Sequence, residues 1–293
     1  MSAVTLPLIV GVDGSEPSLR AVDWAADEAL LRGIPLRVVY ASLWERYEGT
    51  SLAGDLGKPS EQVLADDIVD SAARRARRRH PDLDVSVDVV PEEPEYGLVR
   101  EGRRATALVL GTRGRSGLTD LVLGSVSLTV AARADCPVIV LRGSHDNRAL
   151  SGTDGRIVVG VGDDAKESPA LRFAADEARR RGVPLEAVRA WRCPAYESSD
   201  HPLMAGEPAR LHEEHAVEAL DAALADLPAD VEVHGRTVEG HARKVLLEAS
   251  AGAGLLVVGA RRRDVTFGLQ LGRVAHGVLH HADCPVAVVP HRV

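Results

Sequence analysis

The sequence predicts an α/β protein made of two tandem domains, each an open five-stranded parallel sheet with helices on both faces. Its 293 residues are enough for two domains that each bury a core. Short β-branched runs alternate with apolar repeats of helical spacing, as in a doubly wound sheet. The second half repeats the first, because Trp24–Ala29 returns as Phe173–Ala178 and Ala134–Val138 returns as Ala282–Val286.

A polar, glycine-rich stretch separates the two halves. It covers residues 143–155, and its composition is typical of a linker. We therefore expect a first domain at residues 1–142, a linker at 143–155 and a second domain at 156–293.

The first two strands are the clearest elements. Leu8–Val12 is a continuous β-branched run, typical of a parallel strand buried on both faces. Turn residues follow in Asp13–Pro17, and apolar residues at helical spacing then lead to Arg32–Gly33, a basic last turn with a terminating glycine. Leu36–Ala41 predicts the second strand. Residues 43–60 predict a long loop, and such loops at strand ends often carry function.

The rest of the first half continues the alternation. An apolar repeat predicts a helix from Leu64 to Ala76, and the arginine-rich segment Arg74–His80 that ends it is interpreted as a solvated helix face. The alternation of Leu83 to Val89 predicts a more exposed strand. The remaining predicted elements are a short helix through Leu98, a strand at Ala107–Leu110, a helix at Ser125–Ala134 and a strand at Pro137–Leu141. Right-handed crossovers would fold this series into one parallel sheet.

Composition argues against several classes of protein. The formal net charge is -8 and aromatic residues make up 3%, which disfavours a nucleic-acid-binding face. Three scattered cysteines suit neither a disulfide framework nor a zinc site. The first residues lack a basic signal-peptide region, and no apolar run approaches the ~18 residues of a membrane span. We therefore expect a cytoplasmic protein that contacts neither nucleic acid nor membrane.

One stretch of the sequence predicts a binding site. Residues 111–125 read GTRGRSGLTDLVLGS, between a predicted strand and a predicted helix. Gly111 and Gly114 would let main-chain N–H groups approach phosphate oxygens with no side chain between them. Gly124 and Ser125 open a helix, whose unpaired N–H groups and positive dipole end favour negative charge. The stretch therefore predicts a cradle for nucleotide phosphates.

The chain resembles the universal stress protein family, in its tandem-domain and ATP-binding form, over nearly its whole length. The resemblance rests on the opening Val12-Asp13-Gly14-Ser15 and on the glycine spacing. That spacing is Gly, two residues, Gly, nine residues, Gly-Ser, and it is met by Gly111, Gly114, Gly124 and Ser125. The family's fold is Rossmann-like (adenine nucleotide α-hydrolase-like), with the nucleotide at the strand carboxyl ends. The resemblance implies ATP with Mg²⁺ as cofactor.

The resemblance also implies residue roles. Asp13 would contact the ribose or act as ligand of the phosphate-bound metal, and the main chain of Ala41 would meet adenine. Gly14 and Ser15, in the same turn as Asp13, are also predicted nucleotide-binding residues. The implied phosphate-binding residues are Gly111, Arg113, Gly114, Gly124, Ser125, Val126 and Ser127. The residues alone leave alternatives open: a plain surface turn for the glycines and a capping role for Asp13.

The second half departs from this pattern. Gly162, Arg262 and Arg273 stand at the positions of Asp13, Gly114 and Ser125, although Gly259 and Gly272 remain. An arginine side chain would occupy volume that a phosphate needs, so we expect a degenerate site that binds ATP weakly or not at all. The alternative is that the arginines at 261–263 and Arg273 bind an anion, with Asp163 or Asp164 replacing the lost aspartate.

Other candidate residues favour structural roles. His212 and His215 lie one helical turn apart, and His276 and His280 have the spacing of metal ligands, but neither pair has a recognisable third ligand. We interpret both pairs as solvated or capping histidines. Cys136 and Cys284, at equivalent positions of the repeat, are interpreted as buried small side chains.

No catalytic base or nucleophile stands out, so we expect a nucleotide-dependent stress-response regulator. In this hypothesis ATP orders residues 43–60 and alters a surface that an unknown protein partner reads. The alternatives are a slow Mg²⁺-dependent ATPase or nucleotidyl-transfer enzyme that uses Asp13, and an interaction module that needs no ligand. The apolar last strands, Pro137–Leu141 and Pro285–Val289, predict pairing of the two halves and a homodimer.

Overall fold

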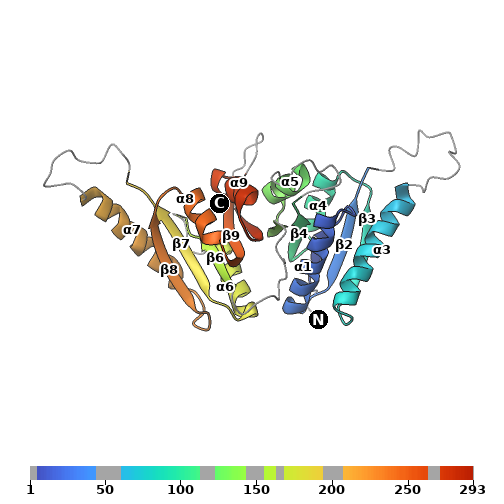
Figure 1. The fold of residues 1–293 in the computed structure, drawn as a ribbon, viewed down its shortest axis with the longest axis horizontal. Helices are drawn as coiled ribbons and strands as arrows, with labels where there is room; N and C mark the ends of the chain where they lie inside the picture. Colours follow the sequence, from blue (N-terminus) through green and yellow to red (C-terminus); the bar gives the residue numbers. More distant parts are fainter. Residues whose placement is uncertain are drawn as a thin grey trace. The chain divides into compact units, whose positions relative to one another are not determined.

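The chain divides into two compact units in the computed structural model (Figure 1). Unit 1 is mostly Met1–Ser151, and unit 2 is mostly Gly152–Thr266 with Leu271–Val293. The structure describes residues 5–43, 61–112, 123–142, 155–162, 168–193, 207–262 and 271–292. Each unit holds one series of alternating strands and helices, as the repeat predicts.

Unit 1 contains a five-stranded sheet. Its described elements are β1 (Leu8–Gly11), α1 (Glu16–Arg32), β2 (Leu36–Ala41), α3 (Glu61–Arg79), β3 (Val85–Val90), α4 (Pro94–Gly102), β4 (Ala107–Gly111), α5 (Ser125–Arg133) and β5 (Val138–Leu141). The strands pair in the order β3-β2-β1-β4-β5, and every pairing in this order is parallel.

Unit 2 has the same topology. Its described elements are β6 (Arg156–Gly160), α6 (Pro169–Arg181), β7 (Leu185–Trp191), α7 (Glu207–Leu224), β8 (Val233–Glu239), α8 (Ala242–Ser250), β9 (Ala253–Arg262), α9 (Arg273–His281) and β10 (Val286–Arg292). The strands pair in parallel in the order β10-β9-β6-β7-β8. The predicted fold class is therefore confirmed.

The central strands are buried on both faces, which explains their continuous apolar sequences. In β1, Leu8, Ile9 and Val10 are fully buried. Val10 pairs with Val38 of β2 on one side and with Val109 of β4 on the other. The edge strand β3 is more exposed, as its alternating pattern predicts, and its Val87 is 40% exposed.

Helices cover both faces of the sheet in unit 1. Helix α1 packs beside α3, and α4 packs beside α5. Helix α1 ends at Gly33, whose φ of 62° is the left-handed conformation that glycine adopts without strain. Gly182 ends α6 in the same way, with a φ of 64°. None of the described helices combines the length and the apolar composition that crossing a membrane requires.

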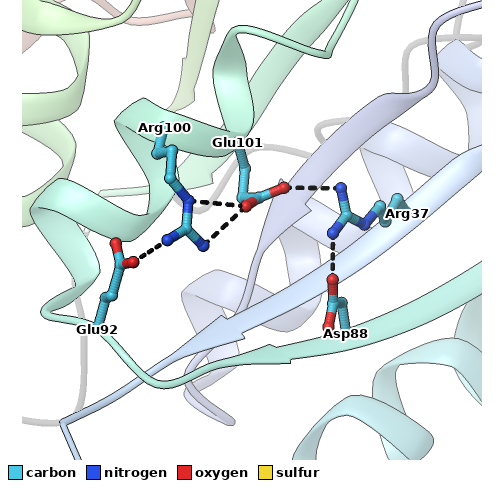
Figure 2. A network of polar contacts seen from close by, with 5 residues as sticks. All are labelled: Arg37, Asp88, Glu92, Arg100 and Glu101. Atoms are coloured by element: carbon cyan, nitrogen blue, oxygen red, sulfur yellow. Dashed lines mark hydrogen bonds and ion pairs between the residues drawn. The ribbon is translucent and has the colours of Figure 1, made fainter.

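A network of charged residues attaches α4 to the sheet (Figure 2). Arg37 of β2 donates from Nη1 to Oε2 of Glu101 over 2.8 Å, and Arg100 donates from Nη2 to Oε1 of the same carboxylate over 3.0 Å. Arg37 also pairs with Asp88 of β3, and Arg100 pairs with Glu92. Glu101 therefore joins two arginines, and it is 12% exposed.

The same network keeps Arg37 charged. Burial lowers the pKa of Arg37, but the hydrogen bond and charge of Asp88 and the contacts with Glu101 outweigh it, so this pKa is raised above its ordinary value. Arg37 therefore stays charged across the physiological pH range, and its contact with Glu101 connects β2 to α4.

Replacing Glu101 by glutamine should destabilise unit 1, because both arginines lose the carboxylate that joins them. We expect a loss of about 1 to 2 kcal/mol, seen as a lower midpoint of urea unfolding followed by circular dichroism. Asp67→Asn makes the same charge change on the exposed surface of α3 and should leave the midpoint unchanged. Equal midpoints for Glu101→Gln and the unaltered protein would show that the network contributes no stability.

Candidate functional site

Unit 1 has a cavity at the carboxyl ends of its strands. It has a volume of about 150 Å³ and lies where β1, β2 and β4 end, beside α4 and the start of α5. Among the residues with a predicted binding role, those that line it are Asp13, Ala41, Gly111, Val126 and Ser127. These five come from four places far apart in the sequence, and the parallel sheet brings them together.

Asp13 lies in the turn between β1 and α1. Its Oδ1 accepts hydrogen bonds from the backbone N of Ser15 over 3.0 Å and from the Ser15 hydroxyl over 2.6 Å. Gly14 between them has a φ of 80°, which explains the glycine. Ser15 is also the N-cap residue of α1. The turn fixes the carboxylate at the cavity wall and occupies one of its two oxygens.

Gly111 ends β4 at a point of close approach. A Cβ atom built on it would lie 2.7 Å from the carbonyl oxygen of Pro17, at the start of α1. The absence of a side chain therefore lets the first turn of α1 pack against the end of β4. Gly111 is predicted to allow the approach of an anion, and packing against α1 is a second, independent reason for this glycine.

Gly124 and the first turn of α5 form the side of the site that suits an anion. Gly124 is the N-cap residue, and its carbonyl accepts the first helical hydrogen bond, from the backbone N of Leu128 over 3.1 Å. The N–H groups of residues 125–127 precede that bond and have no acceptor within the helix. Together with the positive end of the helix dipole, they favour negative charge at the cavity.

The two serine hydroxyls of this turn make protein contacts. Ser127 is buried, and its Oγ donates to the carbonyl oxygen of Gly111 over 2.7 Å, which joins α5 to the end of β4. Ser125 is exposed, and its Oγ lies 3.4 Å from Oε1 of Glu95 in α4. Because both hydroxyls have protein partners, the predicted ligand contacts of this turn would be made mainly by its main-chain amides.

The apolar wall of the cavity was not identified from the sequence. Pro94 and Leu98 of α4, Val39 of β2 and Leu110 of β4 line it together with Ala41. Leu98 had a visible signal as an apolar helix position, but its direction depends on how α4 packs. Arg113, Gly114 and most of the predicted loop at residues 43–60 lie outside the described residues.

The histidine and cysteine candidates do not assemble into a metal site in the part of the chain that the structure describes, where no group of three metal-ligating side chains occurs. The rings of His276 and His280 instead contact each other, with their centroids 4.5 Å apart and their planes tilted by 35°. Cys136 and Cys284 are buried, and all three cysteines are thiols. Burial raises the pKa of the Cys284 thiol to about 12.

Replacing Gly111 by alanine should destabilise unit 1, because the new Cβ would lie 2.7 Å from the Pro17 carbonyl oxygen and the backbone would have to shift. We expect a cost of about 1 to 3 kcal/mol, measured by calorimetric unfolding. Gly259→Ala is the matched control in unit 2, where the Cβ would make an ordinary contact of 3.6 Å with Ala170. Equal shifts of the unfolding temperature in the two variants would refute this packing role.

Cysteine labelling should separate buried from accessible thiols. Because the thiolate is the nucleophile and the pKa of Cys284 is about 12, Cys284 stays protonated at pH values near the ordinary thiol pKa of about 8.5. Iodoacetamide should modify the half-exposed Cys193 in the folded protein and should modify Cys284 only after denaturant is added. Peptide mass spectrometry reads both sites. Labelling of Cys284 as fast as that of Cys193 in the folded protein would contradict its burial.

Comparison with known proteins agrees with this architecture. The model of the Universal stress protein family matches residues 6–142 and 155–290. A universal stress protein from Mycobacterium tuberculosis (strain H37Rv) is 31% identical over 298 residues, which cover 96% of this chain and 96% of that relative.

Two solved structures extend the comparison. A universal stress protein from Archaeoglobus fulgidus has a TM-score of 0.66 at 17% identity and covers 98% of this chain and 99% of its own, a similarity of fold. A universal stress protein in complex with cAMP is 27% identical over 48% of this chain and 100% of its own, with a TM-score of 0.37. Because the family matches both halves of the sequence and a relative matches nearly all of it, this protein belongs to the universal stress protein family.

Proposed function

We propose that this protein is an ATP-binding regulator of the stress response, with its nucleotide site in unit 1. One observation carries the proposal: Asp13, Ala41, Gly111, Val126 and Ser127, which the family resemblance assigns to ligand binding, line the same cavity. The cavity lies at the carboxyl ends of parallel strands, next to the central strand β1, which is where doubly wound sheets bind nucleotides.

The two sides of the cavity suit the two parts of a nucleotide. Val39, Pro94, Leu98 and Ala41 provide an apolar wall that fits the faces of an adenine ring. The unpaired N–H groups at the start of α5 suit the phosphates. Arg113 and Gly114, which lie outside the described residues, complete the phosphate side in this proposal.

Asp13 is the proposed contact for the ribose or for Mg²⁺. Carboxylate oxygens are ligands that Mg²⁺ prefers, and the metal usually bridges a protein carboxylate and substrate phosphates. One oxygen of Asp13 holds the turn through Ser15, which leaves the other for a ligand. The bound metal would lower the repulsion between this carboxylate and the polyphosphate.

The chemistry of the lining favours binding over catalysis. Among the described lining residues of the unit 1 cavity, Asp13 is the sole titratable side chain, and no histidine, cysteine or lysine accompanies it. A reaction that needs a general acid and a general base would require a second group. We therefore infer a signalling role, in which nucleotide occupancy alters a surface near residues 43–60 that a protein partner reads. The proposed setting is cytoplasmic, with the protein acting as a homodimer.

Isothermal titration with Mg·ATP tests the proposal through a matched pair of variants. Val126→Glu places a carboxylate in the proposed phosphate site, and Val274→Glu makes the same change at the equivalent lining position of unit 2. Both valines are partly exposed, so the charge is tolerated in the fold. We expect Val126→Glu to weaken Mg·ATP binding at least about 30-fold, because like charges in contact cost several kcal/mol, and Val274→Glu to leave that binding unchanged.

Three outcomes would change the conclusion. Failure of the unaltered protein to bind ATP, or unchanged binding in Val126→Glu, would refute the unit 1 site. Turnover of ATP that is lost in Asp13→Asn at saturating nucleotide would identify an enzyme. Competition with cAMP in the same titration distinguishes a site for ATP from one that prefers a monophosphate.

A further inference from the structure

Unit 2 has a cavity at the amino ends of its strands, the opposite end of the sheet from the edge at which doubly wound sheets bind nucleotides. Its volume is about 280 Å³, and it lies beside the starts of β6 and β7 and the early part of β8. Its lining residues are Arg156, Pro184, Glu186, His234, Gly235 and Arg236. This end of the sheet takes no part in the function proposed for unit 1, so its charged lining needs a separate explanation.

One carboxylate contacts both arginines of this lining. Glu186 is 14% exposed, and its Oε2 accepts a hydrogen bond from Nε of Arg156. Its Oε1 lies 3.1 Å from Nε of Arg236. Because each oxygen of Glu186 faces a different arginine, the two guanidinium groups share one carboxylate. The series of charges along the cavity wall is therefore positive, negative, positive.

Unit 1 carries the opposite arrangement at the same positions of the repeat. Glu186 and Arg236 correspond to Arg37 and Asp88, and the two pairs of strands have the same register. The ion pair between neighbouring strands is thus retained with its charges exchanged. In unit 1 Arg37 lies between two carboxylates, those of Asp88 and Glu101 (Figure 2), whereas in unit 2 a carboxylate lies between two arginines. The retained pair serves the sheet, and the third charged residue is what differs.

The third residue comes from a different element in unit 2. Ala249 stands at the repeat position of Glu101, and its side chain ends at Cβ. Arg156 of β6 approaches the shared carboxylate instead, and its Nη2 donates to the carbonyl oxygens of Ala249 and Ala251 over 3.2 Å each. Carbonyl groups at the end of a helix lack donors within the helix, and arginine side chains often supply them. These contacts fix the guanidinium of Arg156 at the cavity wall.

Arg236 has hydrogen-bond donors that its protein contact does not use. It lies on the edge strand β8, its side chain is 51% exposed, and its ion pair with Glu186 is made by Nε. In the described part of the chain its two Nη groups make no further contact. A guanidinium presents these N–H groups as a planar fork that matches the two oxygens of a carboxylate. A carboxylate in the cavity would therefore continue the alternation of charge beyond Arg236.

The rest of the lining limits the size and charge of such a ligand. Pockets for drug-sized molecules start at about 300 Å³, so this cavity suits a smaller one. Pro184 and the methylene groups of the two arginines offer apolar surface for an organic body. Because like charges repel, the nearby carboxylate of Glu186 disfavours a doubly charged phosphate more than a singly charged carboxylate.

We propose that this cavity binds a small organic monocarboxylate, whose oxygens accept hydrogen bonds from Arg236 and Arg156. Unit 1 carries its own carboxylate, Glu101, in the equivalent series of charges, and unit 2 takes the corresponding carboxylate from a ligand. The inference does not rest on the function proposed for unit 1, because the cavity lies in the other unit and at the other end of the sheet.

The test is an NMR titration of the full-length protein, isotope-labelled at arginine nitrogen, at constant ionic strength. The Nε–H signals of Arg156 and Arg236 are the reporters, and each is identified by its absence from the spectrum of Arg156→Gln or Arg236→Gln. The probes are benzoate and isobutyrate, their neutral amides benzamide and isobutyramide, and inorganic phosphate. We expect at least one carboxylate to shift both signals saturably, neither amide to do so, and inorganic phosphate to bind more weakly.

Arginine variants test the assignment to this cavity. Arg236→Gln should weaken carboxylate binding at least about 10-fold, read from the Arg156 signal, because hydrogen bonds to a charged group are lost. Arg156→Gln should have a similar effect, read from the Arg236 signal. Arg180→Gln removes the same charge from the exposed last turn of α6 and should change the affinity less than about twofold. Because Arg156 also contacts α8, Arg236→Gln gives an independent result if circular dichroism shows that Arg156→Gln alters folding.

Four results would overturn the inference. They are absence of saturable binding by both carboxylates, equal shifts by the amides, binding of inorganic phosphate as tight as that of the carboxylates, and an affinity in folded Arg236→Gln equal to that in Arg180→Gln. None of these results concerns Mg·ATP binding by unit 1, which the Val126→Glu variant tests separately.

Discussion

The parallel direction of all strands within each sheet is the constraint on which the rest of this structure depends. Because parallel strands share one direction, their carboxyl ends meet at one edge, and the residues that follow β1, β2 and β4 become neighbours there. Strand β1 lies between β2 and β4, and the crossovers from β1 and β4 leave in opposite directions, which opens a crevice at this point. The unit 1 cavity lies in that crevice, and the same geometry recurs at β6 in unit 2.

Packing inside each unit keeps this edge in place. Both α1 and α6 carry a fully buried glutamate, Glu28 and Glu177, and each is paired with an arginine one turn later in the same helix. Because both halves retain this pair, it belongs to the shared scaffold and not to a difference in function. The network around Glu101 has a more local effect, because it attaches α4, which supplies the apolar wall of the unit 1 cavity.

Comparison of the two units distinguishes the residues that maintain the fold from those that line the cavity. The buried positions of the strands and helices are repeated almost unchanged, whereas Asp13 is replaced by Gly162 and Tyr40 by Arg189. These exchanges lie at strand ends and in turns, where a charged side chain reaches solvent and does not disturb the core. A duplicated scaffold can therefore change the side chains at the end of its sheet at little cost in stability, and function follows from the site and not from the fold.

The sequence by itself determined the elements, their order, the duplication and the fold class, because continuous apolar runs, helical spacing and terminating glycines are local signals. Together with the family resemblance it also predicted binding residues, of which Asp13, Ala41, Gly111, Val126 and Ser127 line the unit 1 cavity. The tertiary structure decided which side chains share a cavity. The closeness of Gly111 to Pro17, the wall formed by α4 and the place of Arg189 beside Gly162 all depend on contacts between segments distant in sequence. Such contacts arise only when helices pack onto the sheet, so no local pattern encodes them.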